Sequence, residues 1–534
     1  SHTKGEGTKA HEGGGHEVTR RGRARSHTKG RQDRALLLKE MSRKFSEYIA
    51  VLSEFLLDYG GDLQRDIRSA CADSRHCTEG SLFCAMQGQA FDGHNFVDSA
   101  LQAGAVAVLS ERRLSLPPGM PWAVLRDPYV AFGRIAEFAA DYPARSLKLL
   151  GVTGTNGKTT TAYLLRHMLR SAGFSAGMIG TVEYDLGCSL LPAERTTPTP
   201  FELQKLLAQM RGNQLEYGVL ELSSHALAQE RLGSTKLAGA VFTNLSRDHL
   251  DYHADFEQYY QAKRKLFTEM LQPDAPMIVN LDDPWGRRLA QDCAGQNIVG
   301  YSLEGNKGAA VQVKAIQASL HGSSFSLQWR QSAWRLQSSL SGRFNVYNLA
   351  GAVCLAQALG LEQDSVQKAL DCFQNVPGRM QRIAGDKGPT VFVDYAHTDE
   401  ALRNVLAALR PICQGRLCLL FGCGGNRDRS KRPLMAKAAE QGADLVYLSS
   451  DNPRFEEPED IIADVMRGFA KPEKVKVIVE RQNAIRQAIA GAQPEDVVLI
   501  AGKGHENYQE SKGVKKHFDD AETAAACLQN FWVY

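Results

Sequence analysis

A glycine-rich turn between an apolar run and a helical pattern constrains this chain more than any other feature. The turn, residues 151–160, reads Gly-Val-Thr-Gly-Thr-Asn-Gly-Lys-Thr-Thr, and an apolar run that begins at Leu147 precedes it. A strand, a glycine turn and a helix in this order form a site in which backbone N–H groups and the helix N-terminus bind phosphate. In such a site Lys158 reaches the β- and γ-phosphates, and Thr159 offers its hydroxyl to Mg²⁺.

The turn departs from the strict nucleotide-binding pattern at one position. That pattern has a glycine five residues before Gly157, where this chain has Val152. A plain surface turn is the alternative interpretation, but Gly-Lys-Thr-Thr at a helix start favours a variant phosphate loop. The residues that we expect to bind the nucleotide are Gly154, Thr155, Asn156, Gly157, Lys158, Thr159 and Thr160.

The chain is too long for a single hydrophobic core. At 534 residues, three domains are the natural expectation. The 43% hydrophobic and 23% charged residues are ordinary for a globular protein, and no apolar run approaches the ~20 residues of a membrane span. The eleven cysteines are scattered and lack paired metal-ligand spacing. We therefore interpret them as reduced thiols of a cytoplasmic protein.

The first forty residues differ in charge from the rest of the chain. Residues 1–40 hold ten Lys and Arg against five Asp and Glu, whereas the whole chain has a net charge of +3. The remainder is therefore slightly acidic and gives no indication of a nucleic-acid partner. Because residues 1–40 are rich in Gly, His and Arg, we expect a disordered basic tail, and we take Met41 as a candidate start.

Apolar runs alternate with helical patterns along the rest of the chain. We predict an α/β protein of three domains: a small N-terminal α/β domain (41–146), a central domain like that of phosphate-loop ATPases (147–376) and a C-terminal Rossmann-like domain (377–534). The alternation predicts mostly parallel sheets covered by helices on both faces. Central strands are expected at Lys148–Thr153, Ser175–Gly180, Tyr217–Leu222, Gly239–Thr243 and Pro276–Asn280. C-terminal strands are expected at Thr390–Val393, Arg416–Phe421, Leu445–Ser449, Val475–Val479 and Asp496–Ala501.

Polar side chains follow several of these strands, where parallel sheets bind their ligands. Glu221 ends one apolar run, and a carboxylate at that place is a hard oxygen ligand for Mg²⁺. The alternative is a solvated glutamate beside serines that cap a helix. Residues 244–253 bring several ionisable groups, among them His249, into one loop. That density favours a site over a structural histidine.

Two other places in the chain have an ordinary interpretation from physical chemistry alone. Lys263 lies in a helical pattern, so we interpret it as a solvated lysine. Asn345 and Asn348 stand at an expected helix start, where asparagine either caps the helix or contacts a nucleotide base.

Eight motifs, in order along the chain, together resemble the Mur ligases of peptidoglycan synthesis. They are Gly154–Thr160, Thr196–Pro198, Glu221–His225, Thr243–His253, Ala262–Lys263, Gly342–Asn348, Asp394–His397 and Gly502–Gln509. The resemblance covers roughly residues 65–534, is greatest to the members that add the third amino acid of the peptide, and leaves the first forty residues outside.

The resemblance implies an acid–amino-acid ligase that extends UDP-MurNAc-L-Ala-D-Glu through an acyl phosphate, with ATP as a substrate and Mg²⁺ as a cofactor. It implies contacts with the UDP-linked dipeptide for Ser74, Thr196, Thr197, Ser223, Gln229 and Arg231. It implies that Thr159, Glu221, His249 and a carbamylated Lys263 hold the metal, and that Lys158, Lys263 and His249 are catalytic. Asn345, Asn348, Asp394 and His397 match positions on the ATP side.

The motif Asp451-Asn-Pro-Arg454 implies which amino acid is added. In the family it marks members that accept meso-diaminopimelate, and lysine-adding members lack the arginine. Diaminopimelate ends in an ammonium and a carboxylate, and a guanidinium binds a carboxylate through two parallel hydrogen bonds. The residues implied around this substrate are Arg427, Asp451, Asn452, Arg454, Gly502 and Glu506, with Glu506 facing the ammonium.

One residue departs from the family and two other functions compete with the ligase. Asp399 stands where the family usually has proline, which leaves that turn open. Folylpolyglutamate synthetase shares the phosphate loop, but Asp451–Arg454 argues against it. A non-catalytic scaffold is opposed by the intact Lys158 and Glu221, and an ATP-driven motor leaves the last domain without a role. We expect a cytoplasmic monomer that binds neither nucleic acid nor membrane.

Overall fold

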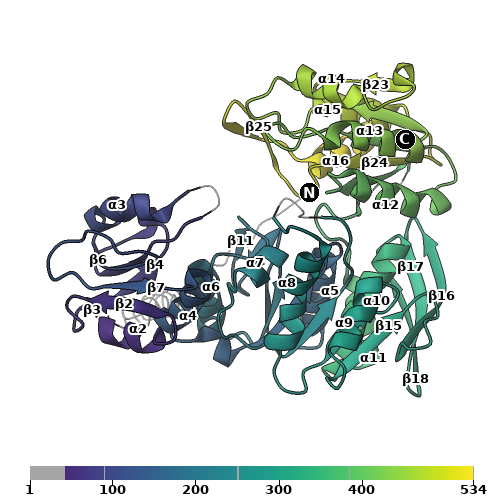
Figure 1. Cartoon of the computed structure of the whole chain (residues 1–534). Coiled ribbons are helices and arrows are strands. Elements are labelled where there is room, and N and C mark those ends of the chain that lie inside the picture. Colours follow the sequence, from purple (N-terminus) through teal and green to yellow (C-terminus); the bar gives the residue numbers. More distant parts are fainter. Residues whose placement is uncertain (1–41, 89–90, 249–251, 384, 386, 533–534) are drawn as a thin grey trace, which may run out of the picture. The chain divides into compact units, whose positions relative to one another are not determined.

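The structure is a computed structural model that describes residues 42–88, 91–248, 252–383, 385 and 387–532 (Figure 1). The chain forms two compact units, Ser1–Pro128 and Tyr129–Tyr534. All eleven cysteines are free thiols. Within the described ranges, no helix combines the length and the apolar character that crossing a membrane requires. The expected tail, residues 1–40, lies outside the described residues.

The first unit is built on a five-stranded sheet of order β2-β7-β6-β5-β4. Its strands are β2 (Leu56–Gly60), β4 (Ser69–Cys71), β5 (Ser81–Cys84), β6 (Ala105–Ser110) and β7 (Trp122–Leu125). All neighbours are parallel except β2 and β7. A two-stranded ribbon, β1 (Arg43–Lys44) with β3 (Asp66–Ile67), and the helices α2 (Phe45–Val51) and α3 (Val97–Gln102) complete the unit.

The second unit begins inside α4 (Pro128–Ala139) and contains an eleven-stranded sheet, of order β11-β10-β9-β12-β8-β13-β14-β15-β16-β17-β18. Seven neighbouring strands are parallel: β9 (Ala176–Ile179), β12 (Tyr217–Glu221), β8 (Lys148–Thr153), β13 (Gly239–Phe242), β14 (Met277–Asn280), β15 (Ile298–Ser302) and β16 (Val311–Ser319). Antiparallel strands form the two edges: β10 (Glu183–Asp185) with β11 (Leu190–Pro192) beside β9, and β17 (Gly322–Trp329) with β18 (Ser332–Ser338) beside β16.

Successive residues of β8 point to opposite faces of the sheet, and both faces are apolar. Helices therefore cover both faces of the parallel strands. Leu150 and Val152 belong to the core beneath α5 (Lys158–Ser171), α10 (Arg343–Ala358) and α11 (Gln363–Cys372). Leu149 belongs to the core on the other face, with α6 (Pro200–Gly212), α7 (Ser224–Ala228), α8 (Phe256–Glu269) and α9 (Pro284–Asp292). The predicted sheet with two covered faces is therefore confirmed.

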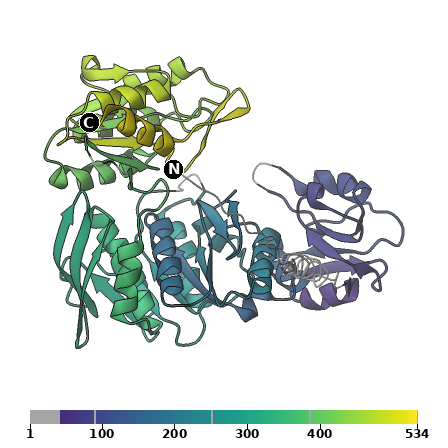
Figure 2. The ribbon, with the colours of Figure 1, turned by 180° about the vertical axis from the view of Figure 1, so that it is seen from behind.

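A second, six-stranded sheet follows in the order β19-β20-β24-β21-β22-β23, seen from behind in Figure 2. Its strands are β19 (Gln381–Ile383), β20 (Thr390–Asp394), β21 (Leu417–Phe421), β22 (Leu445–Leu448), β23 (Val475–Val477) and β24 (Val497–Ala501). Only β19 is antiparallel to its neighbour. One face carries α12 (Asp399–Leu409), α13 (Lys431–Gly442) and α14 (Pro458–Met466), the other α15 (Arg481–Ala490) and α16 (Asp520–Phe531).

The turn at Asp399, which the sequence left open, is an ordinary helix start. Thr398 is the N-cap of α12 and accepts a hydrogen bond from the backbone N–H of Ala401 at 3.2 Å. Asp399 occupies the first helical position, where proline is common in other helices. An aspartate there interacts favourably with the helix dipole, and its side chain also pairs with Arg403. The replacement leaves the helix start intact.

Candidate active site

The glycine turn forms a loop between β8 and the N-terminus of α5. Gly157 is the N-cap of α5 with a φ of +87°, and Gly154 has a φ of +146°. A Cβ at Gly157 would overlap Oδ1 of Asn348, and one at Gly154 would overlap Oγ1 of Thr243. Both the backbone angle and the space therefore demand glycine at these two positions. The loop presents the N-terminus of a fourteen-residue helix, as phosphate binding requires.

Lys158 folds its side chain back over this loop. Its Nζ donates hydrogen bonds to the backbone oxygens of Gly154 and Thr155, at 2.9 and 2.8 Å. Burial lowers the pKa of Lys158, and the carboxylates of Glu221 and Asp248 oppose that shift. The ammonium is thus held at the loop by carbonyl oxygens, which a phosphate can replace as a partner.

Glu221 joins the phosphate loop to the neighbouring strand β12. The glutamate has 0% exposure, so the interpretation of it as a solvated side chain is wrong. Its Oε2 accepts hydrogen bonds from the hydroxyls of Thr159 at 2.9 Å and Thr181 at 3.0 Å. Its Oε1 accepts the backbone N–H of Thr181 at 2.8 Å. A buried carboxylate and a threonine hydroxyl therefore meet beside the N-terminus of α5.

The residues expected around the UDP-linked dipeptide lie next to Glu221. Thr197 donates its hydroxyl to the backbone oxygen of Glu221 at 2.7 Å and accepts the N–H of Ser223 at 3.0 Å. Arg231 donates to the backbone oxygen of Thr197 at 2.6 Å and to Oε1 of Gln229 at 2.8 Å. Burial lowers the pKa of Arg231 to about 10. Thr196 also lies in this cluster, 3.1 Å from the hydroxyl of Thr181.

Lys263 is the largest correction to the interpretation made from physical chemistry alone. Its side chain has 1% exposure, so it is not a solvated lysine. Its Nζ donates to the backbone oxygen of Gly154 at 2.9 Å, the same oxygen that accepts from Lys158, and lies 4.7 Å from the centre of the Tyr259 ring. Burial, and then the neighbouring charge of Lys158, lower the pKa of Lys263 well below its usual value.

Two buried asparagines lie in the first turns of α10, and one of them, Asn348, contacts the phosphate loop. Asn345 donates its amide to the backbone oxygen of Ser341 at 2.8 Å, and Asn348 donates to Oδ1 of Asn345 at 3.1 Å. The N-cap of α10 is Gly342, so the capping interpretation of these asparagines is wrong. Asn348 approaches Gly157 closely enough to exclude a side chain there.

Two of the expected residues cannot be placed beside this cluster. His249, expected as a metal ligand, lies outside the described residues. Ser74 belongs to the first unit, where it starts a short 3-10 turn, Ser74–His76, that Asp73 caps. Arg75 pairs with Asp73 at 2.6 Å and holds that turn together.

Asp394 and His397 follow strand β20 of the six-stranded sheet. The carboxylate of Asp394 accepts the backbone N–H groups of Met380 at 2.7 Å and Ala396 at 2.8 Å. Burial raises the pKa of Asp394. The ring Nδ1 of His397 lies 2.8 Å from the backbone oxygen of Tyr395, and burial lowers the pKa of His397.

Arg454 ends the Asp451–Arg454 loop with an unusual backbone angle. Its φ is +53°, a left-handed conformation that non-glycine residues rarely adopt. The backbone N–H of Arg454 donates to the oxygen of Glu510 at 3.0 Å, which anchors the residue to strand β25 (Tyr508–Ser511). Its guanidinium donates to the backbone oxygen of Gly425 at 2.9 Å and lies 3.7 Å from the Glu510 carboxylate. The planar fork is thus oriented by Gly425, in the loop after β21, and by Glu510 on β25.

Asp451, Asn452, Gly502 and Glu506 gather at the carboxyl ends of β22 and β24. The amide of Asn452 donates to Oε2 of Glu506 at 2.7 Å, and Oδ1 of Asp451 accepts the backbone N–H of Asn452 at 2.6 Å. Gly502 has a φ of +113°, and a Cβ there would crowd Oδ2 of Asp451. Burial raises the pKa of Glu506. Arg427 lies in the loop after β21 and is exposed.

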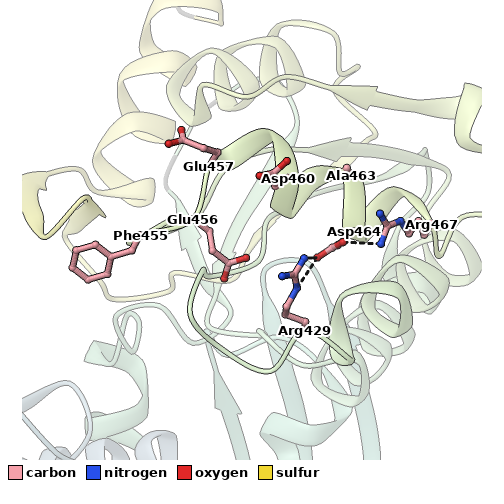
Figure 3. A pocket seen from close by; sticks show the side chains of 8 residues that line it. All are labelled: Arg429, Phe455, Glu456, Glu457, Asp460, Ala463, Asp464 and Arg467. Atoms are coloured by element: carbon pink, nitrogen blue, oxygen red, sulfur yellow. Dashed lines mark hydrogen bonds and ion pairs between the residues drawn. The ribbon is translucent and has the colours of Figure 1, made fainter.

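A pocket of about 380 Å³ borders the residues that follow Arg454 in the chain (Figure 3). Its lining residues are Arg429, Phe455, Glu456, Glu457, Asp460, Ala463, Asp464 and Arg467. Arg429 and Arg467 bind Asp464 at 2.7 and 3.0 Å. The fully buried Arg432 binds both Asp464 and Glu456. Arg432 thus links Glu456, two residues after Arg454, to Asp464 of α14, and none of the expected substrate residues lines the pocket.

Sequence reasoning missed three residues that contact the expected site. Thr181 holds Glu221, Glu510 faces Arg454, and Lys503 contacts Asn452. Thr181 and Lys503 each lie within two residues of the carboxyl end of a parallel strand, β9 and β24. That position is the signal that could have identified both. Glu510 has no such signal, because its place depends on how strand β25 meets the Asp451–Arg454 loop.

Comparison with known families and proteins agrees with this arrangement. The family models that match are the Mur ligase family catalytic domain over residues 66–137, the Mur ligase middle domain over 152–356 and the Mur ligase glutamate ligase domain over 378–504. The chain therefore belongs to the Mur ligase family, which confirms the resemblance predicted from its motifs.

Individual relatives span nearly the whole chain. A protein of Geobacter sulfurreducens named UDP-N-acetylmuramoyl-L-alanyl-D-glutamate--2,6-diaminopimelate ligase is 40% identical over 492 residues, which is 88% of this chain and 96% of that protein. The protein of the same name from Aquifex aeolicus is 42% identical over 462 residues, 86% and 94% of the two chains. A solved structure of that name is 35% identical, covers 92% of this chain and 99% of its own, and has a TM-score of 0.66.

Proposed function

We propose that this protein is an ATP-dependent ligase that joins meso-diaminopimelate to UDP-MurNAc-L-Ala-D-Glu in peptidoglycan synthesis. One observation carries the proposal. Glu221 accepts a hydrogen bond from Thr159 at the phosphate loop, and its backbone oxygen accepts one from Thr197 in the cluster of buried polar groups. Relatives named for the same reaction, identical at about 40% of positions over most of the chain, support it.

The first half of the reaction transfers the γ-phosphoryl group of ATP to the γ-carboxylate of the D-glutamate. A carboxylate oxygen attacks the γ-phosphorus, the bond to the bridging oxygen breaks, and ADP leaves. Lys158 stabilises the charge that develops on the phosphate oxygens, together with the N–H groups at the start of α5. The proposed ATP contacts are Gly154 through Thr160, Asn345, Asn348, Asp394 and His397.

The second half forms the amide bond. An amine of diaminopimelate attacks the acyl carbon, the carbon–oxygen bond to the phosphate breaks, and inorganic phosphate leaves as the amine loses a proton. Thr196, Thr197, Ser223 and Arg231 position the dipeptide beside Glu221, with Gln229 behind Arg231. Ser74 is proposed to contact the UDP part. Holding the reactants in register supplies much of the acceleration.

The residues around the phosphate loop fit a magnesium ion. Thr159 and Glu221 offer a hydroxyl and a carboxylate whose oxygens lie 2.9 Å apart, and Mg²⁺ binds through one or two carboxylates together with substrate phosphates. His249 is a further proposed ligand. The ion supplies positive charge that screens the phosphate oxygens when it is bound.

Lys263 is suited to carry a carbamate. Only a neutral amine adds to carbon dioxide, and burial beside Lys158 lowers the pKa of Lys263 and so favours the neutral form. In this step the Nζ–carbon bond forms, the amine loses a proton, and a carboxylate results. The new carboxylate would add hard oxygen ligands at the loop that Lys158 also contacts.

Arg454 is proposed to select diaminopimelate over lysine. Its guanidinium offers the bidentate geometry that the distal carboxylate of diaminopimelate requires and that lysine lacks. Glu506 would accept the distal ammonium, and the other proposed contacts are Arg427, Asp451, Asn452 and Gly502.

The proposal also covers the domains of the chain, its oligomeric state and its place in the cell. We infer a UDP-binding domain over residues 41–146, an ATP-binding domain over 147–376 and an amino-acid-binding domain over 377–534, after a basic tail. The enzyme would act as a cytoplasmic monomer on small substrates, without nucleic acid or membrane. Its product would serve cell-wall growth, and thereby cell shape and division.

The proposal is tested by an end-point ligation assay. The protein is incubated with UDP-MurNAc-L-Ala-D-Glu, ATP, Mg²⁺ and meso-diaminopimelate, and the nucleotide products are identified by mass spectrometry. We expect the UDP-tripeptide and one equivalent of inorganic phosphate, and neither when any one substrate is left out. ATP hydrolysis without a new peptide, with every amino acid tried, would contradict the proposal.

A further inference from the structure

A fully buried lysine lies beneath the proposed amino-acid site and has no role in the function proposed above. Lys503 follows Gly502 after strand β24, and its side chain has 0% exposure. A lysine is almost never buried completely unless its ammonium is paired or hydrogen bonded. The contacts of this ammonium therefore indicate what the residue does.

Three segments of the chain supply those contacts. Nζ of Lys503 donates to Oδ1 of Asn452 at 3.2 Å and to the backbone oxygen of Tyr508 at 2.5 Å. It also lies 3.5 Å from Oε2 of Glu506. The lysine thus connects the Asp451–Arg454 loop, the segment after β24 and the beginning of β25.

Asn452 is engaged entirely within this network. Its Oδ1 accepts from Lys503 and from the backbone N–H of Glu510 at 2.9 Å, while its Nδ2 donates to Glu506 at 2.7 Å. The residue has 1% exposure. The Asn452 side chain thus bonds to both Lys503 and Glu506, so a change in the position of Lys503 also changes that of Glu506.

We propose that Lys503 is a positioning residue of the amino-acid site: its ammonium holds Asn452 and Glu506 in the orientation in which Glu506 receives the distal ammonium of diaminopimelate. This inference rests on the proposed function and gives a role to Lys503, which lies inside the Gly502–Gln509 motif but received no role from the sequence. Lys503 itself remains covered, so it acts through Glu506 and not on the substrate.

The charges around Glu506 support this role. Burial raises the pKa of Glu506, the charge of Asp451 raises it further, and the charge of Lys503 opposes both. A carboxylate that must bind a cation has to stay ionised, and Lys503 is the cation nearest to it on the same segment. The other titratable groups whose charges interact with Glu506 are Arg481, Tyr395 and Tyr508.

The test compares Lys503→Gln, which removes the charge but keeps a donor, with Lys503→Arg, which keeps the charge. For Lys503→Gln we expect the KM for diaminopimelate to rise about 10- to 100-fold, the size of a lost hydrogen bond to a charged group. The KM values for ATP and the UDP-dipeptide should stay within about 2-fold. The acid limb of kcat/KM for diaminopimelate should move to higher pH, because removing the cation raises the pKa of Glu506. For Lys503→Arg the limb should stay in place.

A double-mutant cycle with Glu506→Gln separates positioning from a merely structural role. If Lys503 acts through Glu506, Lys503→Gln should add little to the KM defect of Glu506→Gln. Lys476→Met, which removes an exposed lysine beside the Tyr447 ring of the same sheet, is the control and should leave all three KM values unchanged.

Several results would overturn the inference. One is an equal rise of all three KM values, and another is an additive KM defect in the double-mutant cycle. A third is a pH profile of kcat/KM whose acid limb moves in Lys503→Arg, or stays in place in Lys503→Gln. Circular dichroism and ADP binding establish that each variant is folded. Failure of the wild-type protein to ligate any amino acid would contradict the proposed function, whereas an active wild type with an unaffected Lys503→Gln would contradict this inference alone.

Discussion

The phosphate loop and the Asp451–Arg454 loop both follow parallel strands, but they are held in different ways. The phosphate loop combines local and distant support. Lys158 bonds to backbone oxygens three and four residues before it, while Asn244 and Lys263, from later segments, also bond to the loop. The Asp451–Arg454 loop depends on distant segments: Asn452 bonds to Glu506, and Asp451 accepts from Gln509. Local bonds and positive-φ glycines therefore specify part of the first loop, whereas the second depends mainly on the segment around Glu506 and Gln509.

This difference predicts how each loop responds to mutation. A change in the phosphate loop should remove chemistry and leave the rest of the fold intact. A change in the second loop, or in its supports, should alter the choice and binding of one substrate. Four substitutions test that contrast, in order of decreasing effect.

Lys158→Ala should lower the ligation rate by about 10³-fold or more, because it removes the cation that meets the phosphate oxygens. The measurement is the steady-state rate at saturating substrates. Lys205→Ala, which changes an exposed lysine of α6, serves as the control. A folded Lys158→Ala protein with a near-normal rate would refute the role of the phosphate loop.

Lys263→Ala should lower the rate by about 10²- to 10³-fold, since it removes a group that supports the phosphate loop and carries the proposed carbamate. Small carboxylic acids should restore part of the activity by supplying the missing oxygens. Lys265→Ala, two residues along the same helix, should show neither the loss nor the rescue. Wild-type mass without an added carbon dioxide, together with an active Lys263→Ala, would exclude the carbamate.

Arg454→Ala should raise the KM for diaminopimelate by about 10- to 150-fold, since it removes a charge-assisted hydrogen bond to the distal carboxylate. The KM for ATP should change little. Arg454→Lys should restore little, because an ammonium lacks the planar fork. Arg467→Ala, at the exposed end of α14, is the control. Unchanged diaminopimelate kinetics in Arg454→Ala would show that another residue selects the substrate.

Thr181→Val should raise the Mg²⁺ concentration for half-maximal rate by up to about 10-fold. Its hydroxyl orients the Glu221 carboxylate, and a partner behind a metal ligand affects the metal less than the ligand does. Thr268→Val on α8, whose hydroxyl bonds only within its own helix, is the matched control. An unchanged magnesium requirement would mean that Glu221 needs no such support.

The strands and the phosphate loop could be predicted from the sequence because their signals are local. The expected strand Lys148–Thr153 matches β8 residue for residue, and glycines at 154 and 157 are needed where the loop turns. Alternating apolar runs were enough to predict both parallel sheets. Boundaries were less accurate: the expected strand Ser175–Gly180 is one residue shorter at each end in the structure, as β9 (Ala176–Ile179).

Burial of individual charged residues could not be predicted in this way. Lys263 sits in an ordinary helical pattern, and only the packing of α8 against the phosphate loop buries it. Lys503 and Glu510 obtain their roles from the Asp451–Arg454 loop, about fifty residues earlier in the chain. Family motifs supplied a role for Lys263 but none for Lys503 or Glu510, which only the folded arrangement identifies.

Whether this chain ligates diaminopimelate is decided by its choice between two amino acids. The wild-type protein is assayed with ATP, Mg²⁺ and UDP-MurNAc-L-Ala-D-Glu, and kcat/KM is measured for radiolabelled meso-diaminopimelate and for L-lysine. Our account predicts a preference for diaminopimelate of at least about 10-fold, the lower bound for one charge-assisted hydrogen bond. Equal values, or a preference for lysine, would contradict the claim.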